Sequence, residues 1–63
     1  MNRPPSGSMV WWRFRKQGGE YRFGYCTYVS GPCLIRLGRW NGDTTHGSVV
    51  DVNEIEWKKH DRR

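Results

Sequence analysis

The stretch from residue 20 to residue 40, EYRFGYCTYVSGPCLIRLGRW, decides the fold of this chain. Two runs with the composition of β-strands, residues 21–29 and 33–40, flank Ser30, Gly31 and Pro32. Tyr, Phe, Thr and Val favour strands, whereas Gly and Pro are strong breakers of regular structure. Two such runs three residues apart predict a β-hairpin. The first run also contains a glycine, which is typical of a bend, a bulge or a close approach of two backbones.

Three further strands are predicted outside this hairpin. In residues 9–16, apolar positions alternate with Trp and Arg, and a Gly-Gly turn follows. The other two are the short runs 48–52 and 55–58, which a single turn at residues 53–54 separates. No stretch has the periodicity of an amphipathic helix. The inward positions of these runs predict a core of Val10, Trp12, Phe14, Phe23 or Cys26, Ile35, Leu37, Val50, Val52 and Ile55.

The order of these elements predicts an all-β domain. Five short strands, a bent second strand and one turn before the last strand are typical of a small closed or nearly closed barrel, which has few exposed strand edges. We expect the barrel to span residues 9–58, with flexible tails at 1–8 and 59–63. The pattern resembles the Src-homology-3-like barrels, a group that includes Tudor domains and the C-terminal domain of retroviral integrases.

Three segments are similar to the plasmid-encoded type II dihydrofolate reductases, which are also barrels of this group. They are residues 13–16 (RFRK), 24–27 (GYCT) and 46–49 (HGSV). Those enzymes are tetramers whose shared pore carries a Val-Gln-Ile-Tyr segment that binds folate and nicotinamide. This chain has Val-Val-Asp-Val at residues 49–52, so the Gln and the Tyr are missing and Asp51 replaces an apolar residue. The resemblance implies the fold, and a reductase of this type is the remote alternative for the function.

Composition indicates a small, basic, folded protein. A 63-residue chain buries only roughly 60% of its unfolded surface, and four Trp, three Tyr and two Phe supply the bulk that its core needs. The net charge is +5, largely from arginine, whose planar fork suits phosphate and carboxylate groups. Such a surface is typical of nucleic-acid binding, although acidic proteins attract it too and solubility alone is the plain alternative.

Catalysis and metal binding are not predicted. A nucleophilic Cys26 or Cys33 would need a histidine base, and nothing places His46 or His60 beside a thiol. The spacing Cys-x6-Cys with single distant histidines does not match a zinc site. There is no apolar signal segment and no membrane-length apolar run, so we expect a cytoplasmic protein with reduced, buried thiols. A cross-strand disulfide is the alternative. We expect no enzyme activity, no cofactor and no membrane partner.

Basic and aromatic residues alternate on the predicted outer face. Trp11 shares a face with Arg13 and Arg15, and Trp40 follows Arg39 at the mouth of a loop. Stacking of a base on an aromatic ring is worth about 1–3 kcal/mol, and a neighbouring arginine adds phosphate contacts. The candidate binding residues are Trp11, Arg13, Arg15, Arg22, Tyr28, Arg36, Arg39, Trp40, Lys58 and Lys59.

Two kinds of partner fit this pattern. The first is nucleic acid, DNA or RNA. The alternative is an acidic protein surface, because Trp and Arg are also enriched in the energetic centres of protein interfaces. In that case the chain would be an adaptor or inhibitor, encoded by a phage or mobile element, that acts on a larger nucleic-acid-processing machine. The sequence leaves open the choice between the two partners, any base preference and the oligomeric state.

Overall fold

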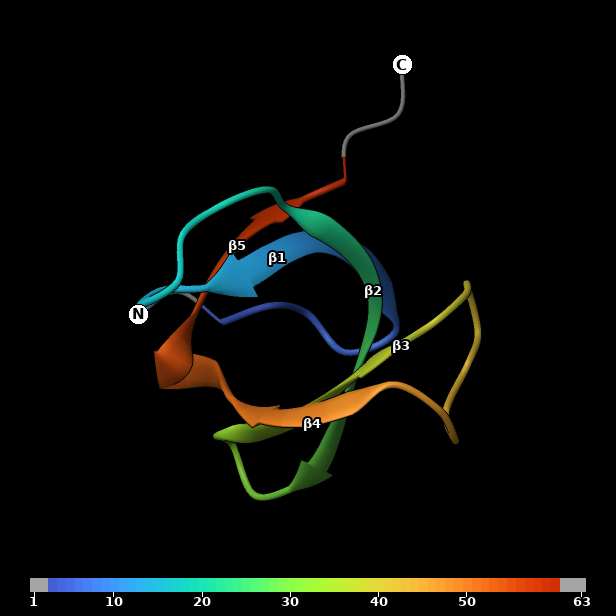
Figure 1. The fold of residues 1–63 in the computed structure, drawn as a ribbon. Helices are drawn as coiled ribbons and strands as arrows, with labels where there is room; N and C mark the ends of the chain where they lie inside the picture. Colours follow the sequence, from blue (N-terminus) through green and yellow to red (C-terminus); the bar gives the residue numbers. More distant parts are fainter. Residues whose placement is uncertain (1–2, 61–63) are drawn as a thin grey trace.

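A computed structural model describes residues 3–60, which form a five-stranded antiparallel sheet (Figure 1). Its elements are β1 (Ser8–Phe14), β2 (Arg22–Ser30), β3 (Leu34–Gly38), β4 (Ser48–Asp51), the 3-10 turn η1 (Val52–Glu54) and β5 (Ile55–Lys59). The predicted all-β class is confirmed, and each predicted strand ends within two residues of its observed bound. The outer parts of the expected tails, residues 1–2 and 61–63, lie outside the described residues. No helix among residues 3–60 is long and apolar enough to cross a membrane.

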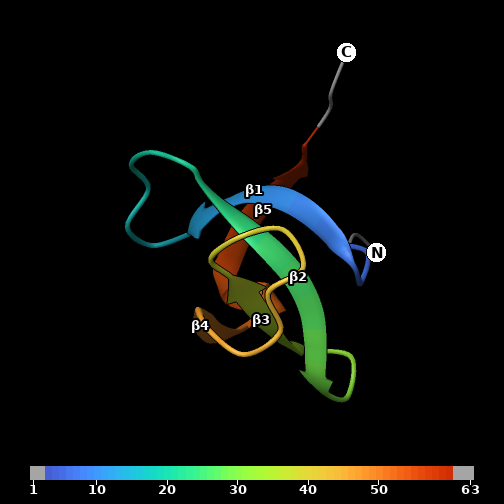
Figure 2. The same ribbon diagram turned by 90° about the vertical axis from the view of Figure 1, so that its right-hand side faces the viewer.

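Strand β2 connects two opposite sides of the molecule. Its residues 22–26 pair with β1, and its residues 25–30 pair with β3. Figures 1 and 2 show β1 and β5 on one side, β3 and β4 on the other, and β2 running between them. A Cβ atom at Gly24 would come within 2.9 Å of the side chains of Leu37 and Trp12. Gly24 therefore leaves room for two core side chains, whereas the register irregularity of β2 lies between Tyr28 and Ser30.

The curved sheet is nearly closed, but it is not a hydrogen-bonded ring. The strand order is β4-β3-β2-β1-β5, so within residues 3–60 the two edges are β4 and β5, and η1 joins them. Asp51 begins this turn, because its side chain accepts a hydrogen bond from the backbone N–H of Asn53 at 2.9 Å. The expected barrel is thus an open sheet that curves around its core.

The core lies between the two sides of the sheet. Its buried hydrophobic residues were all predicted; they are Val10, Trp12, Cys26, Ile35, Leu37, Val50, Val52 and Ile55. Full burial of an aliphatic side chain of this size contributes about 1.5–3 kcal/mol. Phe14 is only partly buried and packs against this core. Of the two alternatives in β2, Cys26 lies inside, whereas Phe23 points outward with 43% of its surface exposed.

Residues 3–7 of the expected N-terminal tail lie against the sheet. Pro4 is fully buried, and its carbonyl oxygen accepts a hydrogen bond from the hydroxyl of Tyr28 at 2.7 Å. The backbone N–H of Gly7 donates to the carbonyl oxygen of Cys26, also at 2.7 Å. These two bonds tie the segment to β2, so this part of the tail belongs to the folded domain.

Candidate nucleic-acid interface

The predicted binding residues do not form a single patch. Trp11 lies opposite Lys58 in the pairing of β1 with β5, and both point outward on that side of the sheet. Arg36 lies opposite Thr27 and Val49, on the outer face of β3. Figure 1 shows β3 and β4 on the opposite side of the molecule from β1 and β5. Arg36 on β3 therefore lies on a different side from Trp11 and Lys58.

The structure corrects the expected positions of Arg22 and Tyr28. Side chains alternate across a strand, so both residues share the inner face of β2 with the buried Cys26. Tyr28 packs against the core and binds the N-terminal segment, and burial raises the pKa of its phenol. The guanidinium of Arg22 lies 5.2 Å from the centre of the Trp12 ring, at the end of the core. Both residues lie on the side of β2 that carries Cys26, where Arg22 stays exposed and Tyr28 is partly buried.

Arg13 and Arg15 are both held by neighbouring groups. Arg13 donates from Nε to Glu56 Oε1 at 2.8 Å and from a terminal nitrogen to the carbonyl oxygen of Gly19 at 2.7 Å. The hydrogen bond to Glu56 raises the pKa of Arg13. Arg15 donates to the carbonyl oxygen of Ile55 at 2.9 Å, and its guanidinium reaches Glu56 Oε2 at 4.0 Å. Glu56 therefore offsets part of the positive charge on this side.

An aromatic cluster of Trp11, Phe23 and His60 lies on the outer face of β1 and β2. Trp11 and Phe23 are direct partners in the strand pairing, and their rings stack with centroids 3.8 Å apart and planes at 23°. His60 meets both rings edge-on, at 4.9 Å from Phe23 and 6.1 Å from Trp11. Sequence reasoning found only Trp11, because it placed Phe23 among the core alternatives and His60 in a tail.

Tyr21 extends this surface next to the aromatic cluster. The guanidinium of Arg13 and the ammonium of Lys58 each lie 4.5 Å from the centre of the Tyr21 ring. Cations at this distance are attracted to the negative face of an aromatic ring. Tyr21 was not among the candidate residues, although it begins the predicted strand 21–29; the structure starts β2 one residue later, at Arg22.

A hollow of about 410 Å³, which we call the Phe23 hollow, adjoins the aromatic cluster. Its lining residues are Gly7, Ser8, Met9, Phe23, Asn41, Lys59 and His60. It therefore brings the end of β5 and the start of β1 together with the loop between β3 and β4. Among residues 3–60, no acidic side chain lines it. Hollows of about 370 Å³ and 300 Å³ elsewhere contain Glu56 and Glu54, respectively, each together with two basic side chains.

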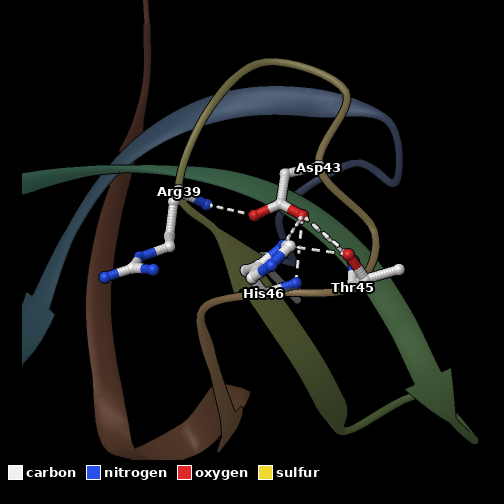
Figure 3. Close-up of polar contacts among 4 residues, drawn as sticks. All are labelled: Arg39, Asp43, Thr45 and His46. Carbon is white, nitrogen blue, oxygen red and sulfur yellow. Dashed lines mark hydrogen bonds and ion pairs between the residues drawn. The ribbon is translucent and has the colours of Figure 1, made fainter.

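The β3–β4 loop is fixed from inside by Asp43, whose side chain is only 2% exposed (Figure 3). This carboxylate accepts hydrogen bonds from the backbone N–H groups of Arg39 at 2.7 Å, and of Thr45 and His46 at 3.0 Å each. Burial alone would raise the pKa of Asp43, but these bonds, together with His46 Nδ1 at 3.2 Å, hold it well below its usual range. The sequence analysis did not select Asp43.

The same loop presents Arg39 and Trp40 at the surface. Only the backbone of Arg39 contacts Asp43, and Figure 3 shows its side chain pointing away from the carboxylate. Trp40 is 52% exposed, and its ring centre lies 4.9 Å from that of His46. Asn41, the next residue of this loop, lines the Phe23 hollow, whereas neither Arg39 nor Trp40 lines it.

The two cysteines form no disulfide in the structure. Both cysteines are free, and burial raises the pKa of Cys26 to about 11. Within residues 3–60, no three His, Cys, Asp or Glu side chains are placed to hold a metal ion. The segment that matches the reductase pore contributes Val50 and Val52 to the core, and Asp51 caps η1.

The fold and this surface define the chain as a small all-β protein with a basic, aromatic outer face. Comparison with models of known families, with curated proteins and with solved structures found no match. The architecture is a curved five-stranded antiparallel sheet, which is compatible with a small barrel. The likeness to Src-homology-3-like barrels and to type II reductases stays a prediction from the sequence pattern.

Proposed function

We propose that this protein is a non-enzymatic module that binds nucleic acid through the outer face of β1, β2 and β5. The observation that carries the proposal is the partly exposed stack of Trp11 and Phe23, with the cations of Arg13 and Lys58 beside it on Tyr21. Aromatic rings accept bases of any sequence by stacking, and adjacent cations contact the phosphates. This face therefore combines the two interactions that single strands and structured RNA use.

Charge supports the same face. Lys58 and Lys59 lie at the end of β5, where Lys58 pairs with Trp11 of the aromatic cluster and Lys59 lines the Phe23 hollow. Glu56 offsets part of the charge of Arg13, but it lies at the opposite end of β5 from the hollow. Phosphate binding by these cations predicts an affinity whose logarithm falls linearly with the logarithm of the salt concentration.

Two substitutions that remove the same charge from opposite sides test the proposal. The measurement is fluorescence anisotropy of a labelled single-stranded oligonucleotide over a series of salt concentrations. Lys58→Ala should weaken binding and reduce the slope of the salt dependence by about 1, as the loss of one phosphate contact does. Arg36→Ala, on the outer face of β3, should leave both the affinity and the slope nearly unchanged.

Two results would overturn the proposal. Equal losses in both variants would mean that the net charge of +5 attracts the oligonucleotide without a defined face. No binding to any oligonucleotide at low salt would exclude nucleic acid as the partner. The alternative of a protein partner would then stand, and a complex that survives nuclease treatment and still depends on Lys58 would support it.

A further inference from the structure

We propose that the Phe23 hollow receives one unpaired base of a single-stranded nucleic acid, and that it thereby selects single strands over duplexes. This inference rests on the proposed function and deepens it. The hollow is lined by an aromatic wall, an amide and a cation, from Phe23, Asn41 and Lys59, respectively. These are the three kinds of group that contact the face of a base, its polar edge and the adjoining phosphate.

The aromatic wall is available because of the way in which the aromatic cluster packs. Trp11 covers one side of Phe23, and His60 meets the ring edge-on, yet 43% of the Phe23 surface stays exposed. A ring that is supported on one side and exposed on another is a rigid stacking surface. Binding a base there orders few side chains, so little conformational entropy is lost.

Asn41 supplies the polar edge of the hollow. Its amide carries both a donor and an acceptor, which is the pair of groups that a base edge requires. Asn41 lies on the loop that Asp43 holds through three backbone N–H groups, so its backbone position is fixed before any ligand binds. The loop is therefore preorganised relative to Phe23 on β2.

The lining of the hollow also suits an anionic chain. Lys59 lines it, and no carboxylate of residues 3–60 does. Each of the two hollows near η1 combines one carboxylate, Glu56 or Glu54, with two cations. A phosphate there would meet a carboxylate as well as the cations, whereas at the Phe23 hollow it meets no carboxylate among residues 3–60.

The size of the hollow points to a single nucleotide. At about 410 Å³ it falls within the range of about 300–1,000 Å³ that is typical of small-ligand pockets. In a duplex the bases are stacked and paired, and moving one of them out of the stack costs a few kcal/mol. A single strand has no such pairing to break. The hollow therefore favours single strands over duplexes, because only a duplex must unpair and unstack a base before that base can bind.

Paired affinity measurements test this inference. An oligonucleotide and a hairpin duplex of matching composition are titrated against the wild-type protein at one salt concentration, and we expect the single strand to bind about tenfold more tightly. Asn41→Leu removes the polar edge of the hollow at an exposed loop position and should abolish this preference, leaving duplex affinity and the salt slope unchanged. Asn53→Leu makes the same change beside the other hollows and should keep the preference. Circular dichroism confirms that each variant is folded.

The outcomes separate this inference from the proposed function. Equal affinity of the wild type for single strand and duplex would overturn the inference while the proposed nucleic-acid function stands. A preference that Asn41→Leu leaves intact would overturn it in the same way, because the base would then bind elsewhere. No binding of either nucleic acid would overturn both.

Discussion

The rings of Trp11 and Phe23 stack at 3.8 Å on the outer face of the sheet, although aromatic residues of a small domain usually supply its core. The two residues are direct partners in the β1–β2 pairing, so the stack follows from the register of two strands. Both rings are kept from the interior by alternation, since Val10 and Trp12 on β1 and Cys26 on β2 already occupy it. Aromatic surface is thereby left on the outside of the sheet, where 43% of Phe23 is exposed.

Phe23→Ala should therefore affect binding more than folding. Loss of one stacking platform is expected to weaken oligonucleotide binding by about 1–3 kcal/mol. The lost aromatic pair costs about 0.5–1.5 kcal/mol of stability beyond the loss of the apolar area that the ring buries, and Leu34→Ala also loses such area. Leu34→Ala is the matched control, because Leu34 is similarly exposed at 40% but lies on β3. Anisotropy titrations and urea unfolding of both variants provide the measurement. Equal affinity of the two variants would contradict a role for the Trp11–Phe23 stack.

The lowered pKa of Asp43 predicts that the folded protein loses stability in acid. Its hydrogen bonds lower its pKa in the folded state below the value of about 3.9 that an unfolded aspartate has. Between these two pKa values the unfolded chain binds more protons, so the free energy of unfolding falls as the pH falls. The contribution of Asp43 should be complete above about pH 5 and should decrease progressively below it. Urea midpoints measured by Trp fluorescence from pH 7 to pH 3 check this.

Asp43→Asn and Asp51→Asn form the matched pair for this test. Both remove one carboxylate, but Asp51 makes only the single capping bond to the backbone of Asn53, whereas Asp43 binds three backbone N–H groups. Asp43→Asn should lower the urea midpoint at pH 7 and flatten its dependence on pH in acid. Asp51→Asn should have both effects only to a small extent. Equal pH profiles for the two variants would show that the Asp43 carboxylate does not hold the loop.

Much of the fold could be predicted because local composition and alternation agree with it. Gly31 and Pro32 mark the β2–β3 turn, and the apolar positions of each strand identify the core. The same alternation also predicts that Phe23 lies on the outer face. Because Cys26 and Phe23 are three residues apart in one strand, they must lie on opposite faces, and the choice of Cys26 for the core places Phe23 outside.

The candidate interface could be predicted only in part, because it depends on contacts between distant segments. Nothing local to Asn41 shows that its loop meets the end of β5, and nothing local to His60 shows that it reaches Phe23. Alternation separates inner from outer residues, but it does not predict which strands lie on opposite sides of a curved sheet. For this reason Arg36 and Lys58 appeared equivalent in the sequence, although they lie on opposite sides of the molecule.

Substitution by alanine should lower the free energy of unfolding more at Gly47 than at Gly42. Both have positive φ angles, +91° and +93°, so alanine is strained at either position, by about 1–2 kcal/mol. At Gly42 a Cβ atom would meet open space, whereas at Gly47 it would overlap the carbonyl oxygen of Leu37. Gly47→Ala should therefore cost more than about 3 kcal/mol in urea unfolding, a loss expected of disrupted packing. Equal stabilities of the two variants would mean that the backbone at residue 47 shifts to accommodate the Cβ atom without loss of stability.

Cys26 and Cys33 should react at very different rates in the folded protein. Cys26 is fully buried, and this burial raises its pKa to about 11, so at pH 8 only about one thiol in a thousand is the reactive thiolate. Cys33 lies in the β2–β3 turn and is only partly buried. Iodoacetamide followed by mass spectrometry should give one adduct, on Cys33, and a second only in denaturant. The Cys33→Ser variant should give none in the folded state, and rapid labelling of it would contradict the buried position of Cys26.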